Sequence, residues 1–335
     1  MSFIKLPIIL SVFIYVCFFL IRFQQGGWDI RLDLFRAQRE ILDQTIGGYL
    51  PSPQAELLSG IILGEKKSLP PEFRLALRDT STLHIVVVSG QNLTLVSMFF
   101  LALSGLIKRR VAICLSFLAI IFYTLLTGAQ IPVLRAAIMV SLTFIAQIFG
   151  RQKEGLWVLS LTGGLMLLIN PNWIFDLSFQ LSFMATFGLI VITPVLLKKF
   201  KFLPLIGQDL AVTLGAQIMV IPIIAQNFHQ ISLVGVITNV LIGWTIPFIM
   251  IFGGILLVLN FFSQFLTQMI SLILATFLTY FVYVVYFFAS LPFSWEYIGE
   301  QFWIVWIGYY LVVAGALIII HKKLDVRSEK LDKEV

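Results

Sequence analysis

Charged residues are scarce in this chain: Lys, Arg, Asp and Glu make up 12% of its 335 residues, whereas 59% are hydrophobic. With a mean hydropathy of +0.98, the chain has too little polar surface to cover a soluble globule of this length, so that class of protein is excluded. Its apolar runs are long, and the short alternating segments of an outer-membrane barrel are absent from the sequence. The sequence therefore predicts an all-α fold, a polytopic helical bundle integral to a membrane.

Thiols, metal ligands and nucleotide-binding loops are also sparse. The two cysteines, Cys17 and Cys114, lie in apolar runs, where we interpret them as small core residues. The three histidines, His84, His229 and His321, lie far apart, whereas a metallohydrolase site needs clustered His and Asp ligands. The sequence also has no Gly-rich phosphate-binding loop with a Lys. We therefore expect no metal, no cofactor and no enzymatic activity.

Ten apolar segments are candidate membrane spans. They are 6–23, 83–107, 111–128, 131–149, 155–170, 177–197, 207–226, 231–259, 264–289 and 302–320. If the N-terminus is inside, the inner loops carry basic clusters such as Lys108-Arg109-Arg110, while the short outer turns at 128–131, 171–176, 227–230 and 290–301 carry no Lys or Arg. By the positive-inside rule, this alternation predicts a multi-pass protein of the plasma or inner membrane with both termini in the cytoplasm.

Two of these segments leave alternatives open. The run 6–23 resembles a signal peptide, but no convincing small-residue cleavage site follows it, and we expect a retained first helix. The segment 231–259 is longer than one span needs and carries Gly235, Gly243 and Pro247. It is either a kinked span or two half-helices, and in the second case the orientation of everything after it changes.

The long outer segment between the first two spans has a different composition, because residues 24–82 hold seven Lys or Arg and eight Asp or Glu. Apolar positions recur at helical spacing over 29–46, opposite a charged face, which predicts an amphipathic helix in the membrane interface that Gly47-Gly48 ends. The apolar face comprises Ile30, Leu34, Ala37, Ile41 and Thr45, and the charged face Arg31, Arg36, Arg39 and Asp43. A short apolar run over 57–63 follows, and Pro70-Pro71 predicts a further short helix to about Arg78.

A polar break interrupts the second span at Ser89-Gly90-Gln91-Asn92. Such a break at membrane depth is tolerated only against protein or a water-filled cavity. Arg135 lies about one turn inside the fourth span, so it needs a partner or water. Three interpretations remain open: an ion pair with Asp176, an anion contact that Asp176 positions, or extension of Arg135 to the lipid headgroups.

Depth along the spans, counted at about 1.5 Å per residue, brings further polar side chains to the outer half of the bilayer. They are His84, Ser89, Gln91 and Asn92 in the second span, Gln130 at the start of the fourth, Gln180 and Ser182 in the sixth, and Gln226, Asn227 and His229 at the end of the seventh. Each alone could be an interhelical hydrogen bond. Together they predict a polar vestibule that opens outward and narrows toward Gly90.

Four motifs resemble the membrane competence domain of ComEC-type DNA-uptake proteins. They are the 57–69 run with Gly64-Glu65-Lys66, the run from Ser81 to Gly90, Leu126-Thr127-Gly128 with the 132–137 run, and Asn170-Pro171 with the 177–183 run. The order and spacing match over roughly residues 30–320. The resemblance implies an inner-membrane channel that carries one DNA strand into the cytoplasm. We expect the vestibule residues His84, Ser89, Gly90, Gln91, Asn92, Gln130, Arg135, Asp176, Gln180 and Ser182 to line the path.

The chain departs from that family at two points. Members often carry Leu-His after the Ser-Gly, where this chain has Gln91-Asn92. Larger members also have an oligonucleotide-binding barrel and a metallo-β-lactamase-like domain, neither of which is recognisable in these 335 residues. We therefore expect single-stranded DNA and membrane lipids as partners, together with a separate nuclease, a DNA receptor and a cytoplasmic ATPase or helicase. A homo-oligomer is compatible with the sequence.

These interpretations divide the chain into four parts. They are an N-terminal transmembrane helix over 1–28, outer-face amphipathic helices over 29–82, a competence-type transmembrane channel domain over 83–321, and a charged cytoplasmic tail over 322–335. Two other functions stay open: a secondary transporter for a small anionic solute, in which Arg135 and broken helices form the site, and a membrane remnant that no longer conducts.

Overall fold

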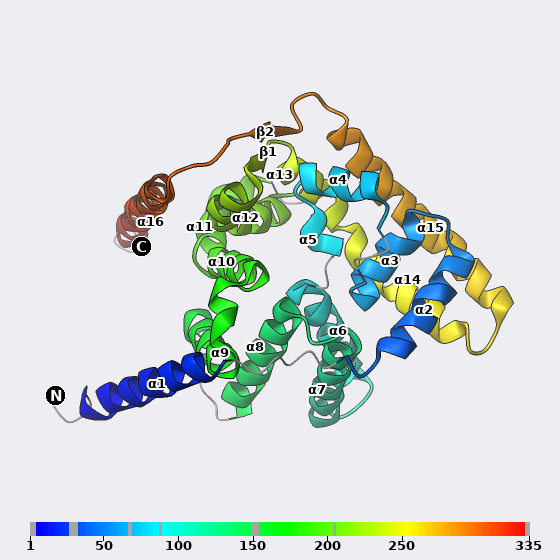
Figure 1. The fold of residues 1–335 in the computed structure, drawn as a ribbon, viewed down its shortest axis with the longest axis horizontal. Helices are drawn as coiled ribbons and strands as arrows, with labels where there is room; N and C mark the ends of the chain where they lie inside the picture. Colours follow the sequence, from blue (N-terminus) through cyan, green and yellow to red (C-terminus); the bar gives the residue numbers. More distant parts are fainter. Residues whose placement is uncertain are drawn as a thin grey trace. The chain divides into compact units, whose positions relative to one another are not determined.

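The fold is that of a helical membrane protein, and 81% of the chain is helical in the computed structural model (Figure 1). The structure describes residues 5–26, 33–65, 69–86, 89–148, 154–203 and 206–331. The chain forms two compact units. Unit 1 comprises Met1–Ser68, His84–Phe183 and Met250–Ser271, and unit 2 comprises Leu69–Leu83, Met184–Ile249 and Leu272–Val335. The all-α prediction is thus confirmed, with one small sheet as an addition in the described ranges.

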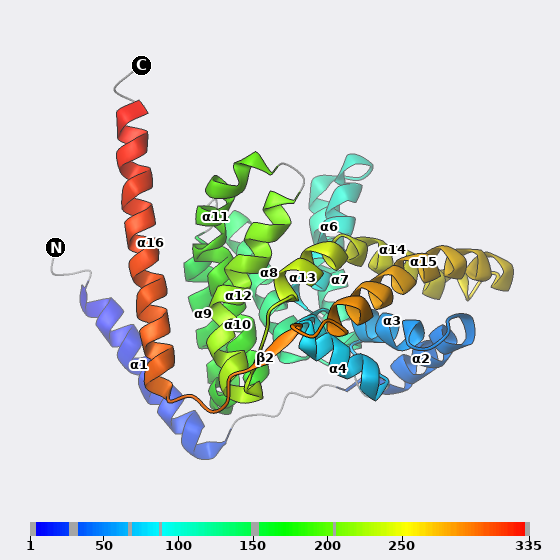
Figure 2. The ribbon, with the colours of Figure 1, turned by 90° about the horizontal axis from the view of Figure 1, so that it is seen from above.

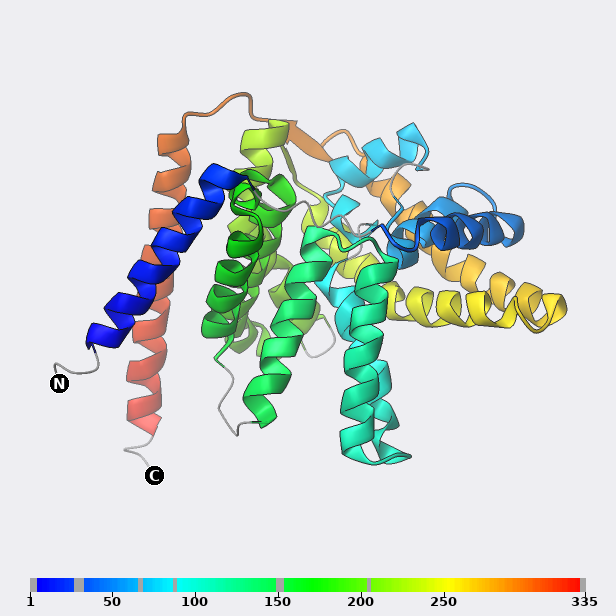
Figure 3. The same ribbon diagram turned by 60° about the horizontal axis from the view of Figure 1, so that its bottom comes forward.

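Unit 1 contains the helices that carry most of the predicted site. They are α1 (Lys5–Gln25), α2 (Arg36–Tyr49), α3 (Gln54–Leu63), α6 (Gly90–Ala102), the 3-10 turn η1 (Leu103–Gly105), α7 (Arg109–Leu126), α8 (Ile131–Ile148), α9 (Gly155–Ile169) and the 3-10 turn η2 (Pro171–Phe175). Helix α6 packs against α7 and α8, α3 packs against α2, and α9 packs against α8 and α1 (Figure 3). Four helices have residues in both units: α5 (Leu83–Val86), α10 (Leu177–Val191), α14 (Thr245–Leu259) and α15 (Gln264–Ala289).

Unit 2 is built around the long helix α12. Its elements are α4 (Pro71–Asp79), α11 (Thr193–Lys199), the 3-10 turn η3 (Phe200–Phe202), α12 (Gly207–Phe228), β1 (Gln230–Ser232), α13 (Gly235–Gly243), β2 (Trp295–Tyr297) and α16 (Trp303–Leu331). Helix α12 contacts α11 and α13. Strands β1 and β2 pair antiparallel with Ile231 opposite Glu296, a pairing that the sequence did not predict.

Tyrosines of α16, the red and orange helix of Figure 2, are bonded to the backbone of α12. The Tyr309 hydroxyl donates to the Ile218 carbonyl at 2.9 Å, and the Tyr310 hydroxyl donates to the Met219 carbonyl at 2.9 Å. Pro222 lies inside α12 and has no N–H group, so it cannot bond the carbonyl four residues earlier, which is that of Ile218. Tyr309 therefore satisfies the carbonyl that Pro222 leaves without its helical partner.

Helices α10 and α12 approach closely within unit 2 through two glycines. A Cβ atom on Gly188 would collide with the carbonyl oxygen of Gly215, and a Cβ on Gly215 would collide with the Thr193 hydroxyl. Small residues permit this kind of backbone approach between membrane helices. Both positions therefore exclude any larger side chain unless the helices move apart.

Four described helices are each long and apolar enough to cross a membrane. They are Arg109–Leu126, Gly207–Phe228, Gln264–Ala289 and Trp303–Ile320. Two bent pairs raise the number to six: Leu177–Val191 with Thr193–Phe202, at 43°, and Gly235–Gly243 with Thr245–Leu259, at 45°. Among the residues whose side chains the structure describes, the other predicted spans have apolar helical stretches of 10–17 residues, so the ten membrane crossings are not confirmed.

Prolines explain the two bends. Pro194 is in the first turn of α11, and its ring would clash with the carbonyl of Ile190 if α10 continued unbroken. Pro247 stands in the same relation to Gly243, at the break between α13 and α14. The segment 231–259, which the sequence left as a kinked span or two half-helices, is therefore a short strand followed by two helices bent at Trp244.

The amphipathic helix predicted over 29–46 differs from α2 in its bounds and in one face. Residues 29–32 lie outside the described ranges, and α2 passes through Gly47-Gly48 to Tyr49. The helix ends there because Leu50 precedes Pro51, which favours the extended backbone that Leu50 adopts. Ile41, on the predicted apolar face, is 63% exposed, whereas Arg39, on the predicted charged face, is buried.

The short helices predicted after it are confirmed. The apolar run 57–63 forms most of α3, which ends at Gly64 in the left-handed conformation. The helix predicted from Pro70-Pro71 is α4, which runs to Asp79. Helix α16 extends to Leu331, so much of the predicted charged tail continues the last helix.

Candidate functional site

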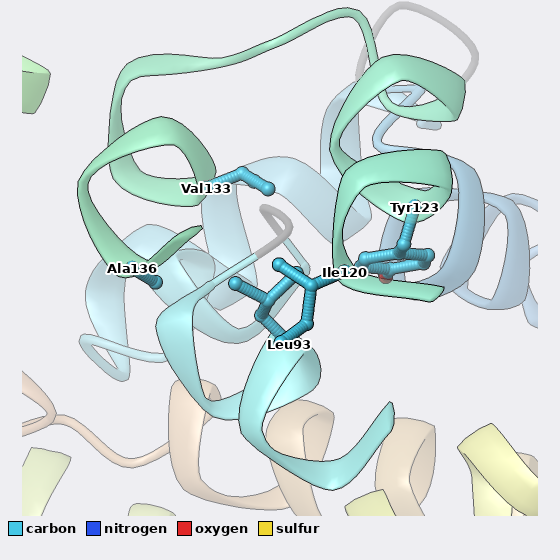
Figure 4. Packing of buried hydrophobic residues seen from close by; sticks show 5 residues of the cluster. All are labelled: Leu93, Ile120, Tyr123, Val133 and Ala136. Atoms are coloured by element: carbon cyan, nitrogen blue, oxygen red, sulfur yellow. The ribbon is translucent and has the colours of Figure 1, made fainter. Parts of the chain in front are cut away.

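The helices that carry the site are held together by a small apolar core in unit 1. Leu93 of α6, Ile120 and Tyr123 of α7, and Val133 and Ala136 of α8 are buried against one another (Figure 4). In a membrane, contacts of this kind stabilise helix association through van der Waals packing, because lipid tails are as apolar as these side chains. The core therefore fixes the first turn of α6 beside the first turns of α8.

Arg135 lies at the junction of α6, α8 and α10. Only 8% of the residue is exposed. Its Nε donates to the Ser182 hydroxyl at 2.7 Å, and its Nη1 lies 3.6 Å from the Met139 sulfur. A Cβ on Gly90 would lie 3.0 Å from the Arg135 Nη2. Gly90 therefore makes room for the guanidinium, which reaches past the start of α6 to a hydroxyl on α10.

Two positive features coincide at this junction. Helix α6 begins at Gly90, and the first N–H groups of a helix have no intrahelical partner and form the positive end of its dipole. The Arg135 guanidinium adds a full charge beside that end. A helix N-terminus with an arginine next to it favours a phosphate or carboxylate group, which accepts charge-assisted hydrogen bonds from both.

Of the three interpretations of Arg135, the ion pair with Asp176 is wrong. The Asp176 carboxylate accepts hydrogen bonds from the backbone N–H groups of Ser178 at 2.8 Å and Phe179 at 3.1 Å. It thus caps the N-terminus of α10, where a carboxylate also interacts favourably with the helix dipole. No ion pair joins this carboxylate to Arg135 in the described part of the chain.

The predicted polar break lies between α5 and α6, and part of it is helical. Gln91 and Asn92 belong to the first turn of α6, and Gln91 is exposed. Asn92 is buried, and its Nδ2 donates to the Ile61 carbonyl at 2.9 Å. The Ser89 hydroxyl donates to the Asn92 side-chain oxygen at 3.2 Å. Asn92 was predicted to line the DNA path, but its amide group joins α6 to the end of α3.

Among the remaining predicted residues, two bond to backbone groups and one is exposed. Gln130 donates to the Gly64 carbonyl at 3.0 Å, and Gln180 donates to the Ile174 carbonyl at 2.9 Å. His84 is exposed on α5. The structure therefore brings Gly90, Arg135 and Ser182 together, while Gln130 and Gln180 bond to backbone. The role of all these residues in lining a path stays a prediction.

Two buried arginines in unit 1 were not singled out from the sequence. Arg22 donates to the carbonyls of Leu168 and Ile169 at the end of α9, at 3.3 Å and 2.9 Å. Arg39 is 7% exposed and bonds to groups on three other segments. Arg22 lies inside an apolar run, which was a signal, whereas Arg39 gave none because it lies among charged residues. Except for Asp33, which is six residues from Arg39, their partners are far away in sequence.

The acidic, histidine and cysteine side chains do not converge. Within the described ranges, no group of three or more His, Cys, Asp or Glu side chains is close enough to hold a metal ion.

Fold and site together define a helical membrane protein whose candidate site is a buried arginine set against the start of an interrupted helix. The chain belongs to the competence protein family, because the family model described as "Competence protein" matches residues 61–323. That range includes the end of α3, the helices from α4 to α15, most of α16 and all ten predicted site residues.

Three relatives give the extent of the similarity. ComE operon protein 3 of Bacillus subtilis is 28% identical over 201 residues, which cover 59% of this chain and 25% of the relative. An uncharacterized protein of Aquifex aeolicus is 32% identical over 242 residues, which cover 70% of this chain and 56% of the relative. The uncharacterized protein YcaI of Escherichia coli is 27% identical over 216 residues, which cover 57% of this chain and 27% of the relative. The chain thus matches between a quarter and somewhat over half of each relative's length. No solved structure matches it.

Proposed function

We propose that this protein is an inner-membrane channel that passes single-stranded DNA into the cytoplasm during DNA uptake. Membership of the competence family and similarity to a ComE operon protein support a role in DNA uptake. The observation that carries the molecular proposal is the Arg135 guanidinium beside the start of α6, next to Gly90 and bonded to Ser182.

The mechanism follows from the charge of the cargo. A single strand carries one phosphate charge per nucleotide, so its path must be hydrated and mildly positive without holding the strand. Arg135 exchanges its hydrogen bond to the neutral Ser182 hydroxyl for one to a phosphate oxygen. The first N–H groups of α6 donate to other oxygens of the same phosphate. One charge attracts each phosphate in turn, whereas a continuous basic lining would hold the polymer.

The proposed topology is multi-pass, with about ten spans and both termini in the cytoplasm. The pairing of β1 with β2 supports the proposed alternation of inner and outer loops, because it puts the turns at 227–230 and 290–301 on one side of the membrane. If α15 crosses the bilayer, the bent pair α13 and α14 must cross it too, since two crossings return the chain to the same side.

The partners remain part of the proposal. The chain spans a quarter of the Bacillus subtilis relative, and we propose that a separate nuclease, a DNA receptor and a cytoplasmic ATPase or helicase act with it. We further propose that the chain itself has no catalytic activity and conducts DNA passively.

The test is uptake of labelled DNA into cells or loaded proteoliposomes that contain the full chain. Arg135→Ala should lower protected DNA at least tenfold, because the buried site loses its charge, whereas Arg135→Lys should retain part of it. Arg109→Ala removes an equal charge from the exposed start of α7 and serves as the control. If Arg135→Ala takes up DNA at the wild-type rate while its abundance is unchanged, the proposed site is refuted.

A transporter for a small anionic solute is the second candidate. The bends of 43° and 45° in two helix pairs favour it, since broken helices commonly surround the sites of secondary transporters. It would replace the DNA channel if deletion of the protein altered anion accumulation and left DNA uptake unchanged.

A further inference from the structure

The guanidinium of Arg39 connects α2 to the turn that precedes α8. Its Nε lies 3.1 Å from the Glu65 carboxylate, and its Nη2 is paired with Asp33. Its Nη1 donates to the Leu126 carbonyl, at the end of α7, at 3.0 Å. The Arg39 side chain is 8% exposed, whereas those of Asp33 and Glu65 are 47% and 32% exposed. Solvent therefore reaches the carboxylates and partly screens both ion pairs, while the guanidinium itself is held inside.

The turn that Arg39 contacts has an unusual backbone. Gly128 has φ of +74° and Ala129 has φ of +49°, so two consecutive residues adopt the left-handed conformation. That conformation is unfavourable for alanine and persists only when the surroundings hold it. A Cβ on Gly128 would also lie 2.8 Å from the Arg39 Nη1. Glycine is therefore required at this position both by the backbone and by the arginine that packs against it.

A second contact holds the other end of the turn. The Gln130 side chain donates to the Gly64 carbonyl at 3.0 Å, and Gly64 directly precedes Glu65. Helix α8 begins one residue later, at Ile131. Arg135 follows four residues on, which is roughly 6 Å along the helix axis. Because a helix is rigid over this distance, a displaced turn would displace the Arg135 guanidinium with it.

We propose that Arg39 and Glu65 are positioning residues that hold the start of α8 and thereby set the Arg135 guanidinium against Gly90 and Ser182. The inference rests on the proposed function of Arg135 for its biological meaning. The positioning role can be tested without DNA, because it changes the local electrostatic potential at the start of α6.

That potential can be measured with a thiol probe. In a Cys17→Ala, Cys114→Ala background, Gln91→Cys places one thiol at an exposed position next to Gly90. The rates of its reaction with an anionic and a cationic methanethiosulfonate are compared as a ratio, which does not depend on protein abundance. A unit charge within roughly a Debye length shifts the two rates in opposite directions. Arg135→Ala should therefore lower the anionic-to-cationic ratio several-fold, which calibrates the probe.

The positioning variants are then read on the same scale. Arg39→Ala and the near-isosteric Glu65→Gln should each lower the ratio by at least half of the change produced by Arg135→Ala. Gly128→Ala should lower it too, because its new methyl group would displace the turn from the other side. Arg39→Lys keeps the charge and should restore part of the ratio.

Arg36→Ala is the matched control. Arg36 lies on the same helix, 3.0 Å from Glu40, with 73% of its side chain exposed. The Arg36→Ala change removes the same charge from α2 without touching the turn, so the ratio should stay within about twofold of the wild-type value, since the charge is screened by solvent.

The outcomes separate the two proposals. Wild-type ratios in Arg39→Ala, Glu65→Gln and Gly128→Ala, with Arg135→Ala lowered, would overturn the positioning role. An equal fall in Arg36→Ala would also overturn it, because bulk charge on α2 would then be the cause. If instead the ratios fall as expected but Arg135→Ala takes up DNA normally, the positioning role stands and the proposed function fails.

Discussion

Replacing Gly90 with alanine tests the geometry of the site with one methyl group. The new Cβ would lie 3.0 Å from the Arg135 Nη2 and 3.3 Å from the Ala136 Cβ. Neither neighbour can give way freely, because the guanidinium is held by its hydrogen bond to Ser182 and the Ala136 methyl belongs to a packed helix. Overpacking of this kind costs about 1–3 kcal/mol, and the better helix propensity of alanine offsets up to about 1 kcal/mol. We therefore expect Gly90→Ala to reduce the free energy of unfolding by about 1 kcal/mol.

The assay is thermal unfolding of the purified protein in detergent micelles, followed by intrinsic fluorescence. A loss of about 1 kcal/mol in a chain of this size lowers Tm by roughly 2 °C. Gly254→Ala, in α14, is the control, because a Cβ there meets nothing within 4 Å. That variant should be as stable as the wild type or more stable.

A double-mutant cycle assigns the cost to Arg135. If the guanidinium is the group that the methyl displaces, Gly90→Ala should cost less when Arg135 is already methionine, which lacks the planar tip. Contacting residues typically couple by more than about 0.5 kcal/mol. A Gly90→Ala protein as stable as Gly254→Ala, or additive effects in the double variant, would refute the contact on which the site is built.

Two further predictions concern unit 2. Tyr309→Phe should lower the free energy of unfolding by about 1 kcal/mol, because the Ile218 carbonyl loses its hydrogen-bond donor. In a Pro222→Ala background the same change should cost less, because residue 222 then has an N–H group that bonds this carbonyl. Equal losses of stability in both backgrounds would contradict this assignment. Gly188→Ala should greatly reduce the amount of folded protein recovered from membranes, because its methyl group would meet the Gly215 backbone, which cannot rotate away; recovery at the wild-type level would contradict the close approach.

The helices of this fold were largely predictable because long apolar runs leave few alternatives to a helix in a membrane. Each of the ten predicted spans contains described helix. Their interruptions were harder to predict, because a bend depends on whether the neighbouring helices accept the freed backbone groups. Strands β1 and β2 went unpredicted because three residues are too few to show an alternating pattern.

The candidate site was predictable in its members and less so in their contacts. Sequence depth placed Arg135 and Asp176 at a similar height, but depth does not say that Asp176 faces the amides of its own helix. Gly90 was predicted to mark the narrow end of the vestibule, and the group that it accommodates in the structure is the Arg135 guanidinium. The burial of Arg39 depends on partners up to 87 residues away, and helical periodicity describes one element at a time.

The β1–β2 pair also constrains the order in which the protein can be assembled. Strand β1 leaves the ribosome well before β2, and the whole of α13, α14 and α15 lies between them. Until β2 is synthesised, β1 has unpaired backbone groups and the intervening helices have no closed loop to hold them together. The small sheet can therefore form only after α13, α14 and α15 have been synthesised.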